Sequence, residues 1–130
     1  MKTDDQVEKI EETHKSFSAL TLEHITRLGI TKSEFCRRTL LSEKTYERIA
    51  YGHLADRPKS ETVMQVCVGL ALSVDESEAL FNAAGYHLGG CRLHEAYRAL
   101  LANGPYTVYG CSSALRSLGL PPLARYLETC

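Results

Sequence analysis

Two histidines and two cysteines in the second half of the chain are the residues whose types and spacing best fit metal chemistry. His87, Cys91 and His94 follow one another closely, and Cys111 is a possible fourth ligand. A helix beginning near Cys91 would place Cys91 and His94 on one face, as a tetrahedral zinc site requires. His87, however, lies across a Gly-Gly pair, and the chain has no second pair of closely spaced ligands. We therefore expect no metal, and we interpret the histidines as capping or surface residues.

A cysteine close to a histidine also raises the possibility of nucleophilic catalysis. That chemistry needs a thiol of lowered pKa, a group that orients the base and a site for the oxyanion. The sequence has no pattern for any of these, and it has no glycine-rich phosphate loop. One sequence does not exclude a Ser-His-Asp triad, but we expect a protein that is not an enzyme and has no cofactor.

Composition indicates one globular, intracellular protein. The chain has 130 residues, of which 44% are apolar, and its 15 basic residues nearly balance its 16 acidic ones. Its five cysteines form no C-x-x-C pair, and an odd number of scattered cysteines indicates reduced thiols. The N-terminus is polar, and no apolar run approaches the ~20 residues of a membrane span. We expect a cytoplasmic protein without a membrane segment.

Helical spacing of apolar residues predicts an all-α fold in which short helices position the remaining polar residues. Residues 1–16 are charged and indicate a polar tail or a frayed helix, residues 17–85 predict five helices, and residues 86–130 add a helical extension. Ser60 and Asp75 are the expected starts of the fourth and fifth helices, and Thr107 is the expected cap of the last major one. Glycine pairs and Asn-Gly-Pro separate the later helices.

The stretch from Thr31 to Gly52 predicts two helices joined by a tight turn. Thr31 and Glu34 have the spacing of a capping box, and Ser42 is a second N-cap. Helical spacing turns Thr45, Tyr46 and Ile49 inward. The polar side chains of the second helix then point outward: Glu43, Lys44, Glu47 and Arg48.

TKSEFCRRTLLSEKTYERIAYG, residues 31–52, resembles the helix-turn-helix of the Cro and phage-repressor family, the Xre-like regulators. The likeness continues in SETVMQVCVGLALSVDE, residues 60–76. It implies a five-helix repressor-type unit with a recognition helix at about Ser42–Ala50, which enters the DNA major groove. Carried over by position, the base-reading residues are Glu43, Lys44, Glu47 and Arg48. The implied phosphate contacts are Lys32, Arg37, Ser42, Arg57 and Lys59.

Two features depart from the family pattern. Leu40 stands at the turn position that is usually glycine, and the acids Glu43 and Glu47 lie on the face that would meet a polyanion. The charge of this region nevertheless favours DNA binding, because residues 31–60 contain seven basic and four acidic side chains, a surplus of three positive charges. A local basic patch on a near-neutral protein fits a modest electrostatic footprint on DNA, while an ordinary mixed-charge surface is the alternative interpretation.

Two classes of function remain. The first is a sequence-specific transcriptional regulator that binds an operator in double-stranded DNA. The second is a protein-interaction module, antitoxin-like or an adaptor, which kept the scaffold but binds a protein partner; the two acids favour it.

The extension, residues 86–130, resembles the helical tail of small Xre-like proteins of Gram-positive bacteria, and that resemblance implies no chemistry. Its tyrosines Tyr97, Tyr106 and Tyr109 have the helical spacing of core or interface residues rather than of a base-stacking platform. Its late apolar residues are Leu115, Leu118, Leu120, Leu123 and Tyr126. They predict a homodimer through residues 86–130, which would let two recognition helices reach half-sites about 34 Å apart.

Overall fold

A computed structural model describes residues 16–52 and 57–124 of the chain. These ranges are all helical, as predicted, and contain seven α-helices and no strand. The helices are α2 (Phe17–Leu28), α3 (Lys32–Thr39), α4 (Glu43–Ala50), α5 (Ser60–Gly69), α6 (Val74–Ala83), α7 (Arg92–Asn103) and α8 (Val108–Ser117). The predicted N-terminal tail or frayed helix lies outside the described residues, except for Ser16, which is the N-cap of α2.

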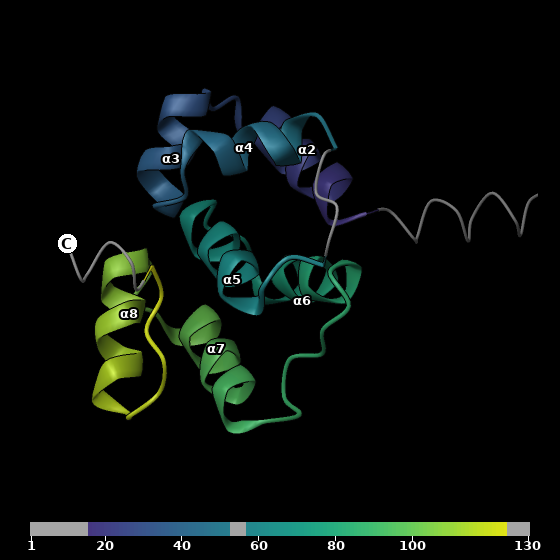
Figure 1. Cartoon of the computed structure of the whole chain (residues 1–130). Coiled ribbons are helices and arrows are strands. Elements are labelled where there is room, and N and C mark those ends of the chain that lie inside the picture. The colour runs from purple at the N-terminus through teal and green to yellow at the C-terminus, as the bar shows by residue number, and fades with distance from the viewer. Residues whose placement is uncertain (1–15, 53–56, 125–130) are drawn as a thin grey trace, which may run out of the picture.

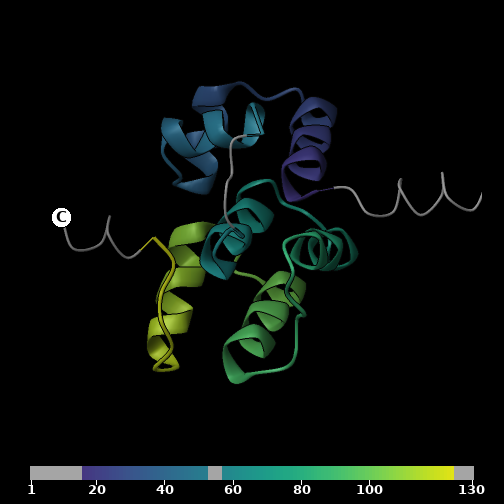
Figure 2. The same cartoon turned by 45° about the vertical axis from the view of Figure 1, so that its right-hand side comes forward.

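Helix α5 lies at the centre of the molecule because nearly its whole circumference is apolar. Residues 63–69 are all buried, including the polar Gln65, and a helix that is apolar all round needs neighbours on every side. α5 contacts α3, α6, α7 and α8. Figures 1 and 2 show α2, α3 and α4 at one end of the molecule, α7 and α8 at the other, and α5 between them.

Most helix ends are where local capping places them. The hydroxyl groups of Thr31, Ser42 and Thr107 each accept a hydrogen bond from the backbone N–H three residues further on, as predicted. Gly29 ends α2 in a left-handed conformation with a φ of 64°. These caps satisfy N–H and C=O groups that the helices leave without internal partners.

Three predicted starts differ from the structure. The Glu34 carboxylate pairs with Arg37 instead of reaching back to Thr31, so only half of the predicted capping box forms. Ser60 is the first residue of α5 rather than its cap, and Lys59 at the cap position makes no side-chain cap hydrogen bond. α6 begins at Val74, one residue before Asp75, because Ser73 and Glu76 form a complete capping box.

The end of α3 lies directly against α5. A Cβ atom on Gly69 would come within 2.6 Å of Thr39 Cγ2 and 2.8 Å of the Arg38 carbonyl oxygen. Beside it, the buried amide of Gln65 donates a 3.0 Å hydrogen bond from Nε2 to the Thr39 carbonyl. A glycine and one buried amide therefore fix the position of α3 on the central helix.

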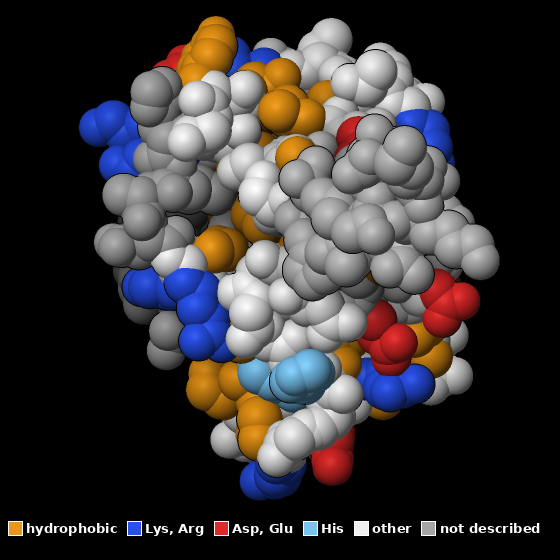
Figure 3. Space-filling view, turned by 90° about the vertical axis from the view of Figure 1, so that its right-hand side faces the viewer, with side chains coloured by type: hydrophobic (Ala, Val, Ile, Leu, Met, Phe, Trp, Pro, Cys, Tyr) orange, Lys and Arg blue, Asp and Glu red, His pale blue; other side chains and the backbone are white. Residues whose placement is uncertain are grey.

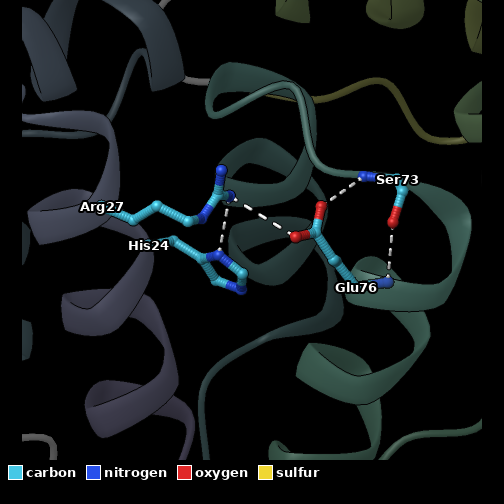
Figure 4. A network of polar contacts seen from close by, with 4 residues as sticks. All are labelled: His24, Arg27, Ser73 and Glu76. Atoms are coloured by element: carbon cyan, nitrogen blue, oxygen red, sulfur yellow. Dashed lines mark hydrogen bonds and ion pairs between the residues drawn. The ribbon is translucent and has the colours of Figure 1, made fainter.

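A polar network ties α2 to α6 (Figure 4). Arg27 of α2 lies 3.5 Å from the Glu76 carboxylate and 3.0 Å from His24 Nδ1. Glu76 Oε1 accepts a 2.9 Å hydrogen bond from the backbone N–H of Ser73, whose hydroxyl accepts one from the Glu76 N–H. The Ser73 backbone N–H is the main cause that lowers the pKa of Glu76, and Arg27 and His24 add to it.

The C-terminal helices complete the core. Tyr97, Leu100 and Leu101 of α7 are buried, as predicted. In α8, Val108, Cys111 and Leu115 are buried, whereas Leu118 just beyond its end is 50% exposed. The segment 119–124 returns along α8 (Figure 1), and Ser112 Oγ donates a 3.0 Å hydrogen bond to the Leu123 carbonyl. Tyr126 lies outside the described residues. None of the described helices is both long enough and apolar enough to cross a membrane.

We expect Gly69→Ala to destabilise the protein by about 1–3 kcal/mol, because the new methyl group overlaps backbone atoms of α3 that cannot move independently. Urea unfolding followed by circular dichroism measures the change. Gly90→Ala is the matched control: a Cβ there meets nothing within 4 Å, so its effect should stay within about 0.5 kcal/mol. A Gly69→Ala protein as stable as the wild type would contradict the close contact.

We expect Glu76→Gln to lower the free energy of unfolding by roughly 0.5 kcal/mol at pH 7, because it removes a charge favoured at a helix start. The folded state lowers the pKa of Glu76 below its ordinary 4.5. The stabilisation is therefore present above pH 4.5 and lost as the pH falls through the folded-state pKa. The difference between wild type and variant should shrink over that acidic range in urea titrations at several pH values. Asp75→Asn, in the same turn, is the control; an equal pH dependence in both variants would mean that the network contributes nothing specific.

Candidate nucleic-acid interface

The connection between α3 and α4 forms a left-handed turn without glycine. Leu40 has a φ of 61° and a ψ of 22°, a conformation that costs a non-glycine residue about 1–2 kcal/mol. Thr39 supports this turn, since its hydroxyl donates to the Phe35 carbonyl and accepts from the N–H of Leu41. Leu41 is itself buried. The tight turn predicted between the two helices is therefore present, although its residue departs from the family pattern.

Packing holds α4 firmly against α3. Phe35 of α3 is fully buried, and its ring meets that of Tyr46 edge-on with centroids 5.2 Å apart. Ile49 is fully buried, while Thr45 and Tyr46 are half-buried, so the predicted inward side of α4 is the observed one. α4 lies at the end of the molecule remote from α7 and α8 (Figures 1 and 2). Its outer side is open to a large partner.

The outer side of α4 carries two stripes of opposite charge. Glu43 and Glu47 are one helical turn apart and form an acidic stripe. Lys44 and Arg48, four residues apart, form a second, basic stripe, which continues at the neutral Tyr51, the C-cap residue just beyond α4; Tyr51 is 71% exposed. Residues at these spacings are neighbours on a helix surface. The four predicted base-reading residues are all exposed, and they divide between the two stripes.

The acidic stripe is partly neutralised by Lys32 of α3. The Lys32 ammonium lies 3.4 Å from Glu47 Oε1. The hydrogen bond to Glu47 raises the pKa of Lys32 most, and the charges of Glu43 and Glu47 raise it further. Lys32, a predicted phosphate contact, is therefore turned toward α4 and bound to a predicted base reader.

Two other predicted phosphate contacts also have partners within their own helices. Arg37 forms a two-pronged ion pair with Glu34, in which Nε lies 3.1 Å from Oε2. This pair lowers the pKa of Glu34 and raises that of Arg37. The Ser42 hydroxyl accepts from the N–H of Thr45 as the α4 cap. Both side chains are exposed, so these contacts leave them accessible to a partner.

Arg57 takes part in a different structure, which we call the Arg57 clamp: Arg57, Pro58, Tyr86 and the carbonyl groups at the end of α6. The guanidinium donates hydrogen bonds of 3.2 Å and 2.7 Å to the carbonyls of Ala84 and Gly85. It also stacks on the Tyr86 ring at 3.8 Å from the centroid. The Tyr86 hydroxyl donates to the Pro58 carbonyl.

The phosphate role of Arg57 remains a prediction; two of the five N–H groups of its guanidinium donate in the clamp. Lys59, two residues later, is exposed and makes no ion pair with any described residue. The structure thus brings Lys32 and Ser42 together with α4, whereas Arg37 pairs with Glu34 on α3 and Arg57 joins the segment before α5 to the end of α6.

Of the histidine and cysteine constellation, His94 and Cys111 pack against other residues, whereas His87 and Cys91 are exposed. His94 is stacked with Tyr97 and meets Tyr86 edge-on, and its Nδ1 lies 3.1 Å from the His87 carbonyl oxygen. Histidine side chains gather in the lower part of the face shown in Figure 3. Among the described residues, no group of three or more His, Cys, Asp or Glu side chains is placed to hold a metal ion.

The described cysteines are free thiols, and two of them, Cys67 and Cys111, are buried. Burial raises the pKa of Cys67 to about 12 and that of Cys111 to about 11. Cys111 Sγ donates to the Pro105 carbonyl. Cys67 is a core residue, as predicted, whereas Cys36 is only half-buried. A nucleophilic thiolate would need the opposite shift in pKa.

Two residues at or near the two helices of the motif, Tyr51 and Arg38, were not among the predicted site residues. Tyr51 extends the basic stripe of α4, and its spacing of seven from Lys44 is the sequence signal that places it there. Arg38 of α3 is half-exposed and makes no ion pair within the described ranges. The sequence does not show which of Arg37 and Arg38 is left without an ion pair. Only the structure shows that Glu34 pairs with Arg37.

Comparisons with known proteins give no relative. The chain matches no protein-family model, no curated protein and no solved structure. The proposals that follow therefore depend on the residues and their geometry.

Proposed function

We propose that this protein is a sequence-specific regulator that binds double-stranded DNA through α4, with α2–α6 as a repressor-type helix-turn-helix unit. The observation that carries the proposal is the exposed basic stripe of Lys44, Arg48 and Tyr51 on a short, firmly packed helix. A helix of this size fits the major groove of B-DNA. The order of the helices and the short turn before α4 support the same interpretation.

The side chains of α4 suit distinct tasks in the groove. Arg48, in the last turn of the helix, can form two hydrogen bonds to guanine, the commonest specific contact in the major groove. Lys44 can donate to a base acceptor or to a phosphate, and Glu43 can accept from the amino group of cytosine. Tyr51 adds an aromatic ring with a polar tip at the end of the stripe. Phosphate contacts would position this helix, and base contacts would provide the choice of sequence.

Binding requires Lys32 to exchange partners. In the free protein its ammonium is held by Glu47 at 3.4 Å. A phosphate group that approaches the start of α3 competes with that carboxylate for the same donor. Part of the electrostatic gain from Lys32 is then offset by the acidic stripe, which limits binding to DNA of any sequence.

The homodimer through residues 86–130 remains a prediction. Tyr106, Tyr109 and Leu118 are exposed large apolar residues in that region. α8 lies across α5 from α4 (Figures 1 and 2). A two-fold contact there would hold the two α4 helices apart rather than side by side, so the proposal is made for one chain on one half-site.

A second candidate is a protein-interaction module on the same scaffold, which the acidic stripe favours. Glu43 and Glu47 on an exposed helix fit a basic protein surface better than they fit DNA. Under this alternative the basic stripe is an ordinary solvated surface, and the protein retains no measurable affinity for duplex DNA.

Arg48→Gln should abolish the preference for one base pair of the operator and weaken operator binding by about 1–3 kcal/mol. The operator is first obtained by selecting bound sequences from random duplexes, and binding is then measured by fluorescence anisotropy. Arg98→Gln is the matched control, because it removes the same charge from α7, where Arg98 pairs with Glu78. If selection yields no sequence, or if both variants behave alike, the DNA proposal in this form is wrong.

Glu47→Gln should raise the affinity for random duplex DNA at low salt more than Glu43→Gln does. Both changes remove a repelling charge, but only Glu47→Gln also frees Lys32, which should steepen the dependence of log K on log salt by about one. Glu95→Gln on α7 is the control for the charge change alone. If neither variant gains DNA affinity and a basic protein partner is lost instead, the interaction-module alternative is favoured.

A further inference from the structure

A groove beside Tyr106 is a feature that the proposed DNA contact does not use. It is a hollow of about 500 Å³ between the end of α3, the end of α5 and the first turn of α8. α3 and α8 lie on the same side of α5 (Figures 1 and 2). Side chains fill little of its floor, because Gly69 has no side chain and Ala71 has only a methyl group.

A second hollow adjoins the first. It has a volume of about 220 Å³, and it shares Val68, Ala71 and Tyr106 with the larger one. Its other walls are almost wholly apolar and include Leu100 and Leu101 at the end of α7. The Tyr106 ring therefore stands between an apolar recess and a wider groove, and it is 66% exposed.

The charge of the larger groove is one-sided. Arg37 and Arg38 line it, and none of the described residues that line it is acidic. Arg37 is already paired with Glu34, whereas Arg38 makes no ion pair with a described residue. Tyr106 and Tyr109, the latter 63% exposed, line the same groove. A groove that combines arginines, tyrosines and small apolar residues is complementary to an anion with an apolar body.

We propose that this groove binds a small carboxylic acid with an aromatic or aliphatic body. The carboxylate takes the two parallel N–H donors of Arg38, the strongest geometry for such a pair. The apolar body lies against Tyr106 and Tyr109 and reaches the smaller recess beside Leu100 and Leu101. The combined space is in the range of sites for small organic ligands, about 300–1,000 Å³.

This site does not depend on the DNA proposal. Its residues are on α3, α5, the segment before α8 and the first turn of α8, whereas the proposed base readers are on α4. Loss of DNA binding therefore leaves the ligand proposal standing, and loss of ligand binding leaves the DNA proposal standing.

The test is titration of the full chain with 4-phenylbutyrate, followed by isothermal calorimetry and by NMR shifts of the tyrosine and arginine side chains. We expect saturable binding with shifts at Arg38, Tyr106 and Tyr109. 4-Phenylbutyramide lacks the negative charge, and acetate lacks the large apolar group. Each should therefore bind at least about tenfold more weakly than phenylbutyrate.

Variants identify the groove as the site. Arg38→Gln and Tyr106→Ala should each weaken phenylbutyrate binding about tenfold, while Arg48→Gln, which removes the same charge from α4, should not change it. Thermal unfolding establishes that each variant is folded, and Arg38→Lys, which keeps the charge, should retain part of the affinity.

Three results would overturn the proposal: no saturable binding of phenylbutyrate or of octanoate, equal binding of acid and amide, or full binding by Arg38→Gln. An acidic peptide that binds in the groove where both acids fail would also overturn it and would assign the groove to a protein partner.

Discussion

The close contact between the end of α3 and the central helix is the constraint on which the rest of the structure depends. Without a side chain at Gly69, the backbone of Thr39 can lie against α5, and the Gln65 amide then satisfies a carbonyl that the end of α3 would otherwise bury without a partner. From this point α3 sets the direction of the turn at Leu40, and the turn sets the direction of α4. The floor of the groove beside Tyr106 also depends on it, because any larger residue at position 69 would push α3 away.

Capping made much of the fold predictable from the sequence, because a cap is a local interaction. Thr31, Ser42 and Thr107 each bond to an N–H only three residues away, so their role can be predicted without knowing the tertiary structure. The helical spacing that favoured a core or interface role for Tyr97 is a short-range signal of the same kind, and Tyr97 is buried. The assignments that failed involve competition between possible partners. Glu34 could bond either to Thr31 or to Arg37, and it pairs with Arg37. Ser73 caps α6, so the helix begins one residue before the expected start at Asp75.

Long-range partners explain what could not be predicted of the candidate site. The sequence places Glu43, Lys44, Glu47 and Arg48 on the exposed side of α4, and the structure does the same. It gives no means of knowing that Lys32 bridges fifteen residues to Glu47, or that Arg57 reaches the end of α6. Both pairings depend on how helices pack, which is set by the core. The left-handed Leu40 has a local cause instead, because the hydrogen bonds of Thr39 and the burial of Leu41 support a conformation that leucine alone disfavours.

The Arg57 clamp and the rings around His94 have a consequence for how the molecule unfolds. The predicted boundary after residue 85 passes between Gly85 and Tyr86, and both of these residues bind Arg57. Phe81 on one side of that boundary contacts His94 and Tyr97 on the other, and α5 packs on α7 and α8. Two segments that share one core cannot melt independently, because separating them exposes apolar surface on both. We therefore expect the described parts of both segments to unfold together as a single cooperative unit.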